Sequence, residues 1–289
     1  MQDFHRRGFV WSILGLFASE GLAWAEPGTD TAIKQIEARL GGRVGLSVLD
    51  TGSGKTLSWR GGERFAMCSS FKWVLAASIL KHADQGQLHL SEPVSYDSAQ
   101  LVGHSPVTAA HVKEGHMRIE DLCAAAVEES DNGAANLLLA RIGGPASVTA
   151  FARSLGDKMT RLDRNEPRLN DNLPGDPRDT TTPDAMVGTM KTVLLGDVLE
   201  PNSRGKLLDW LRKCDTGTQR LRAGLPKDWA EGDKTGTGER GAAVDNAIIW
   251  PPRRAPILAA AYVSDSAKPT AQLEAALADL GRLIGTRFA

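Results

Sequence analysis

Apolar residues at the start of the chain follow first a helical and then an extended period. Spacings of three and four residues predict an amphipathic helix over Thr31–Leu40, closed by Gly41-Gly42. Alternation over Val44–Val48 predicts a strand, and Thr56–Arg60 returns as a second strand after a glycine-rich turn. The apolar residues of these two periods are Ile33, Ile36, Leu40, Val44, Leu46 and Val48.

From Cys68 to Pro226 the apolar spacing is mostly helical, with glycine stops at Gly86 and Gly143-Gly144. One irregular stretch, Arg161–Thr182, interrupts the helices and holds three prolines. A loop of that length inside a compact domain is usually functional. The helices expected in this part are Ser69–Asp84, Arg118–Glu128, Asn132–Ile142, Pro145–Leu155, Pro183–Leu195 and Ser203–Cys214.

The end of the chain is extended again, and apolar residues over Leu273–Ile284 then predict a closing amphipathic helix. Hairpin turns are expected at Gly236–Gly241 and at Pro251-Pro252. The strands expected around them are Glu231–Thr235, Ala243–Trp250 and Ile257–Ser264.

This order of elements predicts an α/β layer combined with an all-α domain. We expect an antiparallel sheet flanked by the two terminal helices, built from residues 26–60 and 227–289. Residues 61–226 form the inserted helical domain.

The composition is that of a soluble globular chain, with 289 residues, 42% hydrophobic and 24% charged. The net charge of −1 gives no reason to expect a nucleic acid or an anionic membrane surface as partner. Both signs are scattered along the chain, so we expect most charges to be solvated surface.

Residues 1–25 have the pattern of an export signal. Arg6 and Arg7 precede a mostly apolar run over Phe9–Ala18, and Ala23-Trp24-Ala25 is a cleavage motif before Glu26. The paired arginines also resemble a twin-arginine signal, so both export routes stay open. We expect a periplasmic or secreted protein without a membrane anchor, since no later apolar run has the length of a spanning helix.

A serine and a lysine three residues apart, in Ser69-Ser70-Phe71-Lys72, open the first long helix expected. Residues at this spacing share a helix face, so the lysine can assist the serine hydroxyl, a weak nucleophile until a base takes its proton. Free N–H groups at a helix start suit a developing oxyanion. A capping serine and a lysine lying along apolar surface would look the same, so the tetrad alone decides nothing.

Two more short motifs follow. Ser130-Asp131-Asn132 offers a hydroxyl for proton transfer and an amide that could bind a substrate amide. Lys234-Thr235-Gly236 offers a cation and a hydroxyl for a carboxylate, and its glycine lets a substrate approach the strand closely. Each motif alone is also an ordinary cap or turn.

Together, in this order and context, the three motifs resemble those of the β-lactamases and penicillin-binding proteins. The long loop separates these two groups, because Glu166-Pro167-Arg168-Leu169-Asn170 resembles the element that holds the deacylating water in class A β-lactamases. Penicillin-binding proteins lack this element. On these motifs the chain is similar to the class A serine β-lactamases over residues 30–288. The resemblance implies the β-lactamase/transpeptidase-like fold and hydrolysis of penicillins and cephalosporins, which gives antibiotic resistance.

The resemblance also implies roles for single residues. Ser69 would attack the ring carbonyl, with Lys72 or Glu166 as the base, and Ser130 would protonate the ring nitrogen. Asn170 would hold the hydrolytic water with Glu166. The substrate would contact His104, Asn132, Arg220, Lys234, Thr235, Gly236 and Thr237, with Arg222 in reserve for Arg220.

The oxyanion hole implied by the family consists of the backbone N–H groups of Ser69 and Thr237. The family further implies an Arg164–Asp179 ion pair at the neck of the loop. A cis peptide before Pro167 and a brace from Asn136 are implied as well.

The three cysteines, Cys68, Cys123 and Cys214, leave at least one free thiol, and their spacing fits no zinc site. The resemblance implies neither a metal nor an organic cofactor. Two family disulfides are interrupted, because the partner position of Cys123 is Ala76 and that of Cys68 is Gly238. The Cys68 bridge belongs to some carbapenem-hydrolysing members.

Two other functions share parts of this pattern. A penicillin-binding D-Ala-D-Ala peptidase would use the same fold, and a sensor module would be acylated by β-lactams without turnover. The Glu166–Asn170 element argues against the peptidase, as does the absence of a membrane anchor. Intact Ser130, Lys234 and Glu166 argue against the sensor, since a module that is only acylated needs no deacylating water. We expect a monomer that binds a small-molecule β-lactam.

Overall fold

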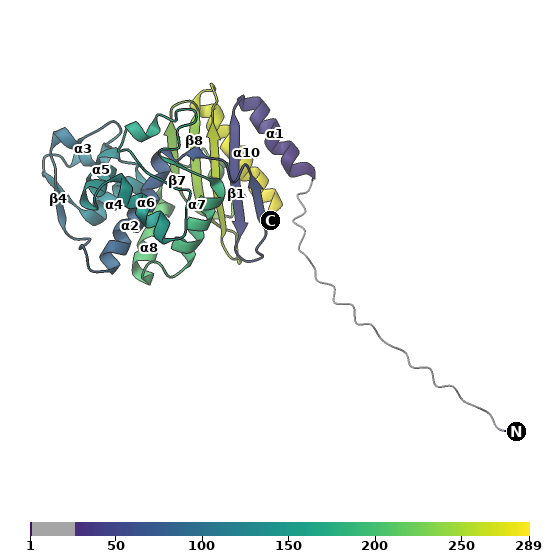
Figure 1. Ribbon diagram of the computed structural model, residues 1–289, viewed down its shortest axis with the longest axis horizontal. Coiled ribbons are helices and arrows are strands. Elements are labelled where there is room, and N and C mark those ends of the chain that lie inside the picture. The colour runs from purple at the N-terminus through teal and green to yellow at the C-terminus, as the bar shows by residue number, and fades with distance from the viewer. Residues whose placement is uncertain (2–26) are drawn as a thin grey trace.

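The computed structural model describes Met1 and residues 27–289, so the expected signal peptide lies almost entirely outside the described residues. Its centre is a five-stranded sheet in the order β2-β1-β9-β8-β7, with every neighbouring pair antiparallel (Figure 1). The strands are β1 Arg43–Asp50, β2 Thr56–Trp59, β7 Ala230–Gly238, β8 Ala242–Trp250 and β9 Ile257–Ser264. The sheet thus joins both ends of the chain, and β7 is one of its edges.

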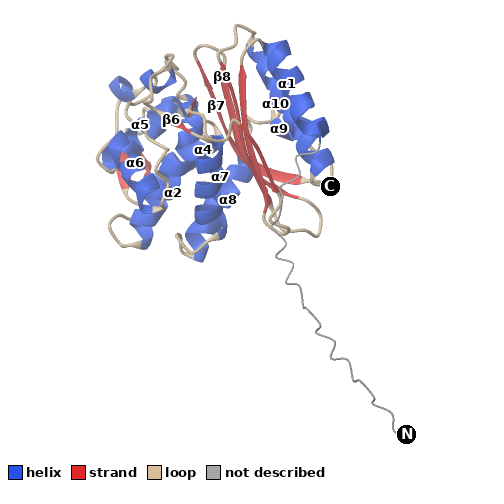
Figure 2. Ribbon diagram, turned by 45° about the vertical axis from the view of Figure 1, so that its right-hand side comes forward, coloured by secondary structure: helices blue, strands red, loops and turns tan. Residues whose placement is uncertain are grey.

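Helices cover both faces of the sheet (Figure 2). On one face lie α1 Pro27–Leu40, α9 Leu221–Gly224 and α10 Thr270–Arg287. Helices of the middle segment pack on the other face, where Val244 and Ile248 of β8 join their core. Because both faces are covered, the whole of β9 is buried.

The middle of the chain supplies the larger helical layer. Its α-helices are α2 Phe71–Asp84, α3 Pro106–Ala110, α4 Ile119–Glu128, α5 Asn132–Arg141, α6 Pro145–Ser154, α7 Pro183–Met190 and α8 Pro201–Lys213. Helix α2 is buried from Phe71 to Leu80 and contacts α4, α5, α6 and α8, so it forms the axis of this layer. The expected helices agree with these bounds to within a few residues, except α1, which begins earlier than Thr31.

Three expected boundaries were wrong. The helix expected from Ser69 begins as the 3₁₀ turn η1 Cys68–Ser70, and the one expected to Leu195 ends as the π-helix η4 Lys191–Leu195. The expected hairpin turn Gly236–Gly241 also lies partly within a strand, because β7 pairs with β8 as far as Gly238. Glycine and polar residues indicated a turn there, but pairing with β8 keeps the backbone extended.

Short elements were not expected at all. Strands β3 Phe65–Ala66 and β6 Thr180–Thr181 pair with each other, as do β4 Pro93–Ser95 and β5 His116–Arg118. The 3₁₀ turns η2 Ser98–Gln100 and η3 Arg168–Asn170 and the short helices α3 and α9 were not expected either. Strands of two or three residues have no readable period, so only long-range pairing defines them.

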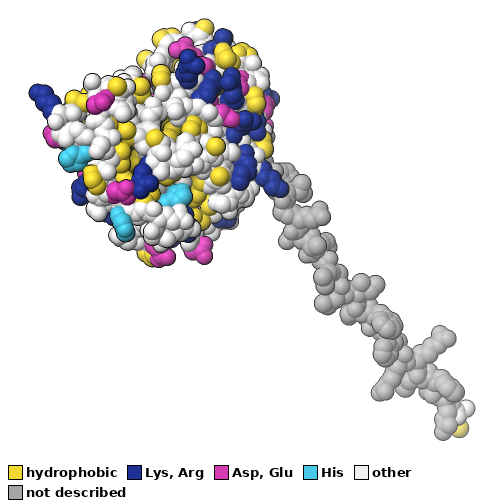
Figure 3. Space-filling view, turned by 60° about the vertical axis from the view of Figure 1, so that its left-hand side comes forward, with side chains coloured by type: hydrophobic (Ala, Val, Ile, Leu, Met, Phe, Trp, Pro, Cys, Tyr) yellow, Lys and Arg dark blue, Asp and Glu magenta, His cyan; other side chains and the backbone are white. Residues whose placement is uncertain are grey.

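The surface carries both signs of charge. On the face shown in Figure 3, basic and acidic side chains are interspersed with apolar and neutral ones. In the described part of the chain, no helix combines the length and the apolar character that crossing a membrane requires.

Candidate active site

Ser69 lies in the turn η1, directly before α2 and against β7. The turn is entered through Cys68, whose backbone is left-handed at φ 46°. The Ser69 hydroxyl donates to Glu166 Oε1 at 3.0 Å and accepts from Lys72 Nζ at 3.0 Å. The serine therefore has two neighbouring groups that can move its proton.

Lys72 projects from the first turn of α2 and is fully buried. Its ammonium donates to Asn132 Oδ1 at 2.6 Å and to the Ser130 carbonyl at 2.7 Å, and lies 3.1 Å from Glu166 Oε1. Burial lowers the pKa of Lys72 to about 8, with the Lys234 charge lowering it further and the Glu166 charge opposing both. A lysine in this range can both give and take a proton near neutral pH.

Ser130 reaches the site from the connection between α4 and α5, with a left-handed backbone at φ 58°. Its hydroxyl lies 3.5 Å from Lys72 Nζ. The next residue, Asp131, is buried and caps α5 through Ala134 N–H. It also accepts from the N–H and hydroxyl of Thr108, so this connection is fixed against the α3 region.

The long loop places Glu166 over Ser69. Asn170 Nδ2 donates to Glu166 Oε2 at 2.6 Å, so each carboxylate oxygen has a different partner. Asn136 of α5 donates from Nδ2 to the Glu166 carbonyl and accepts at Oδ1 from the Glu166 N–H, each at 3.0 Å. The Glu166–Pro167 peptide is cis, as the resemblance implied.

The neck of this loop is closed by charge. Arg164 Nε donates to Asp179 Oδ2 at 2.5 Å, and Asp179 Oδ1 accepts from the N–H groups of Asp163 and Arg164. Asp179 is buried, and its own carbonyl accepts from the Met67 N–H beside the nucleophile turn. The expected ion pair thus connects the loop to the segment that carries Ser69.

Strand β7 lines the opposite side of the site. Antiparallel pairing places Lys234 and Gly236 on the face toward the helical layer, and Thr235 and Thr237 on the other. Lys234 is fully buried and donates to the Thr235 carbonyl at 3.2 Å, and burial lowers its pKa. The Thr235 hydroxyl bonds that of Thr216.

Gly236 allows β7 to approach the nucleophile turn. A Cβ there would lie 2.6 Å from the Met67 carbonyl oxygen and 3.0 Å from the Ser70 nitrogen. No larger residue fits without moving the strand, so Gly236 sets the gap between Ser69 and Thr237.

His104 and Thr237 are exposed at the rim. The His104 ring bonds the Glu129 carbonyl at 3.0 Å, and its own carbonyl accepts from Asn132 N–H at 2.8 Å. A connected set of hydrogen bonds thus joins Ser69 to Lys72, Ser130, Asn132, Glu166 and Asn170, and Gly236 lies against the turn that carries Ser69.

The comparisons with known proteins identify the family of the chain. A family model described as the β-lactamase enzyme family matches residues 29–288. The carbapenem-hydrolysing β-lactamase KPC of Klebsiella oxytoca is 46% identical over 86% of this chain and 85% of its own. The β-lactamase CTX-M-97 of Escherichia coli is 44% identical over 86% and 84%. The solved structure of the class A β-lactamase of the last common ancestor of Gram-negative bacteria superposes on this chain with a TM-score of 0.89. The two sequences are 53% identical, and the match covers 90% of this chain and 99% of that one.

The chain belongs to the class A β-lactamases. It is therefore a serine hydrolase that opens the β-lactam ring, an activity that gives antibiotic resistance. The comparisons do not favour a penicillin-binding peptidase or a sensor module.

Arg220 of this β-lactamase is only 4% exposed and binds protein groups. Its guanidinium donates to the carbonyls of Gly236 and Val244 at 2.7 Å and to Thr237 Oγ1 at 2.6 Å. It also lies 3.5 Å from Glu274 Oε1. Its charge thus stands behind β7 and holds the Thr237 hydroxyl.

Arg222 has other partners. It pairs with the buried carboxylates of Glu231 and Asp233 on β7. These contacts hold the Arg222 guanidinium at Glu231 and Asp233, whereas Arg220 bonds Thr237 beside the site.

All three thiols of this β-lactamase are free and buried. A Cβ at position 238 would lie 2.6 Å from Cys68 Sγ, so Gly238 does occupy the place of the missing disulfide partner. Burial raises the pKa of the Cys68 thiol to about 12, which keeps it protonated and unreactive.

Sequence reasoning missed Glu274 and the support given by Asp131. Glu274 carried no signal, because a helix surface position shows nothing of its partner across the fold. Asp131 was visible as a cap or turn residue, but its bonds to Thr108 carried no signal, since they join segments far apart in the sequence. Within residues 27–289, no three His, Cys, Asp or Glu side chains are grouped so that they could hold a metal ion.

Proposed function

We propose that this β-lactamase opens penicillins and cephalosporins through an acyl-enzyme on Ser69, with Glu166 and Asn170 activating the hydrolytic water. One observation carries this proposal: the Ser69 hydroxyl lies 3.0 Å from both Lys72 Nζ and Glu166 Oε1, and Asn170 holds the second oxygen of that carboxylate. Nucleophile, proton acceptor and water-holding amide are thus in contact before substrate arrives.

In acylation, Ser69 Oγ bonds to the ring carbonyl carbon while its proton passes to Lys72 or, through a water, to Glu166. The carbonyl oxygen takes the negative charge and receives hydrogen bonds from the N–H groups of Ser69 and Thr237. The C–N bond then breaks, and Ser130 gives its proton to the ring nitrogen. Lys72 then gives a proton to Ser130. Lys72 Nζ lies 3.5 Å from Ser130 Oγ, so a small movement of either side chain suffices for this transfer.

In deacylation, a water between Glu166 and Asn170 loses a proton to the carboxylate and attacks the ester carbon. The ester C–O bond breaks, and Ser69 Oγ regains a proton. A positioned carboxylate contributes roughly a hundred- to ten-thousand-fold in such a step.

Substrate binding uses the other wall of the site. We assign the β-lactam carboxylate to Lys234 and the Thr235 hydroxyl, with the Arg220 charge acting from behind β7 through Thr237. Asn132 and the β7 edge at Thr237 take the side-chain amide, Gly236 provides the close approach and His104 forms the rim. Neither a metal ion nor an organic cofactor has a part in this scheme.

The test is a time course of chromogenic cephalosporin hydrolysis with substrate in large excess. Wild-type protein should turn over continuously, whereas Glu166→Gln should give a burst equal to the enzyme concentration and a mass increase on Ser69 that corresponds to the cephalosporin-derived acyl group. Ser69→Ala should give neither. An acyl adduct on another residue would remove Ser69 from the scheme, and undiminished turnover by Glu166→Gln would remove Glu166 from deacylation.

The proposal extends to the domain organisation of the chain and to the cellular location of the protein. We infer that residues 1–25 are a cleaved signal peptide, Sec or twin-arginine, and that the mature protein is a periplasmic or secreted monomer without a membrane anchor. Residues 26–60 and 227–289 then form the sheet domain and 61–226 the inserted helical domain. N-terminal sequencing of the exported protein should begin at Glu26, and retention of Arg6-Arg7 would contradict cleavage.

A further inference from the structure

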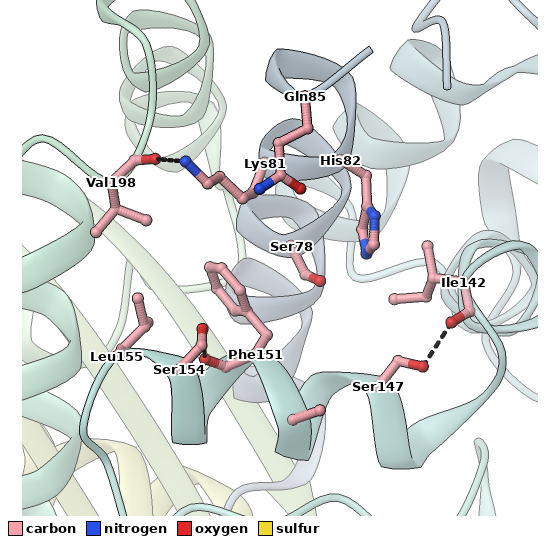
Figure 4. A pocket seen from close by; sticks show the side chains of 11 residues that line it. Ser78, Lys81, His82, Gln85, Ile142, Ser147, Phe151, Ser154, Leu155 and Val198 are labelled. Atoms are coloured by element: carbon pink, nitrogen blue, oxygen red, sulfur yellow. Dashed lines mark hydrogen bonds between the residues drawn. The ribbon is translucent and has the colours of Figure 1, made fainter. Parts of the chain in front are cut away.

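A cavity lies in the helical layer, and none of the active-site residues lines it. It opens between the C-terminal half of α2 and helix α6 and has a volume of about 560 Å³ (Figure 4). Its apolar wall consists of Ile142, Phe151, Leu155 and Val198, and the buried Phe151 ring faces α2. This volume is in the range of small-molecule sites, which are mostly apolar with a few placed polar groups.

One placed polar group is Ser78, which is 1% exposed and lines the cavity from α2. Within the described part of the chain its hydroxyl has no hydrogen-bond partner, unlike Ser147 and Ser154, which bond carbonyls of Ile142 and Phe151. Its oxygen is not one of the fully buried side-chain atoms that lack a partner, so the hydroxyl is accessible from the cavity and can donate a hydrogen bond to an occupant.

The cavity also has a cationic side. Lys81 donates to the Val198 carbonyl at 2.8 Å and makes no ion pair with a described carboxylate, which leaves two of its three donors available. His82 lines the same side, with its Nδ1 on Gln87. None of the residues that line the cavity, all of them within 27–289, is acidic.

We propose that this cavity binds a small planar aromatic carboxylate. The ring packs on Phe151 and Leu155, and the carboxylate accepts hydrogen bonds from the Lys81 ammonium and the Ser78 hydroxyl. Ser78 lies six residues beyond Lys72 on the same helix, about 9 Å along its axis. The ligand therefore contacts the helix that carries Lys72 without touching the acylation site.

The probe is 2-naphthoate, titrated against the full-length protein by ¹⁵N–¹H NMR. We expect shifts of the Ser78, Lys81 and Phe151 amides with a Kd on the order of 1 mM, as fits a ligand of this size. Ala150→Trp places a ring at the mouth and should weaken binding at least about tenfold by occupying the space of the ligand. Ala146→Trp is the matched control, since Ala146 is an exposed residue of α6 outside the lining and should leave Kd unchanged.

Two further measurements test whether the cavity selects a carboxylate and whether the probe binds there rather than in the active site. Lys81→Met should weaken naphthoate severalfold and leave neutral 2-naphthylmethanol unchanged, and Lys234→Ala should leave naphthoate binding intact. Equal binding of the two probes to wild type would overturn the carboxylate assignment. Three outcomes would overturn the location of the site. They are loss of naphthoate binding in Lys234→Ala, an equal Kd in both tryptophan variants, and no shifts at about 10 mM probe. Cephalosporin turnover by Ala150→Trp, measured alongside, confirms its fold, and none of these outcomes depends on the roles proposed for Ser69 or Glu166.

Discussion

At the residue scale, the contact between Lys72 and Glu166 and the burial of both side chains set the pKa of Lys72. The two side chains are fully buried and lie 3.1 Å apart. Burial pulls the pKa of Lys72 down, and the nearby carboxylate pulls it up. The charge state of the lysine therefore depends on neighbours contributed by other segments of the chain.

This balance predicts opposite effects of two substitutions on Lys72. Glu166→Gln removes a charge that raises its pKa, so the value should fall below about 8. Lys234→Ala removes a charge that lowers it, so the value should rise. NMR titration of ¹³C-labelled lysine measures both, and shifts of the same sign would contradict the electrostatic account.

At the scale of elements, the catalytic loop depends on its neck. Arg164 bridges Asp179 and Asp171, and Asp179 in turn holds the backbone on both sides of the loop. These contacts keep the Glu166 carboxylate within hydrogen-bond distance of Ser69, although the loop itself has little regular structure.

Arg164→Ala should slow deacylation more than acylation. The substitution leaves the buried Asp179 carboxylate without its cation, and a displacement of Glu166 by about 1 Å can cost on the order of a hundredfold in rate. Pre-steady-state kinetics should show a burst that is absent in wild type. Arg161→Ala breaks an exposed pair with Asp163 in the same loop and should change little; equal losses in both variants would indicate general unfolding of the loop.

A second prediction at the scale of elements concerns the contact between β7 and the turn that carries Ser69. Gly236→Ala should lower kcat/KM by roughly a hundred- to a thousandfold, because its Cβ forces β7 away from Ser69 and widens the oxyanion hole. The control is Gly62→Ala, where the added carbon meets nothing within 4 Å. Steady-state kinetics with one cephalosporin compares them, and wild-type kinetics in Gly236→Ala would show that the strand can shift without cost.

At the scale of the whole molecule, a group of buried carboxyls lies beneath the site, between β7, β8 and α9. Glu231, Asp233 and Asp245 each keep one oxygen without a partner, while Arg222 pairs with the first two and Leu221 N–H with the third. Burial raises the pKa of all three, and their mutual repulsion raises those of Glu231 and Asp245 further. Arg220, Arg222 and Lys234 oppose the shifts without removing them.

Stability should consequently fall as pH rises. Above about pH 4 the unfolded chain releases these protons while the folded protein retains them, so the free energy of unfolding decreases until the folded-state pKa is passed. Asp245→Asn removes one such group, so its unfolding free energy should fall less than that of wild type between about pH 5 and about pH 8. Urea unfolding at both pH values measures this, with the exposed Asp209→Asn of α8 as control. A parallel fall in wild type and Asp245→Asn would mean that Asp245 is ionised throughout.

The sequence by itself determined the order and type of the long elements and the identity of the reacting groups. Periods of 3.6 and 2 residues mark α1 and β1, whereas α2 and β9, which are buried on nearly all sides, stand out as mostly apolar runs. The motifs around Ser69, Ser130, Glu166 and Lys234 are recognisable because such chemistry requires these residue types at these spacings.

Only the tertiary structure decided where those groups meet and with what properties. The turn η1, the pairing of β7 to Gly238 and the two-residue strands β3 and β6 depend on partners far away in the chain. The partners of Arg220, among them Thr237 and Glu274, come from three separate elements. The lowered pKa of Lys72 and the raised pKa of Asp245 arise from burial among charges of other segments, and burial is a property of the packed chain that no local spacing contains.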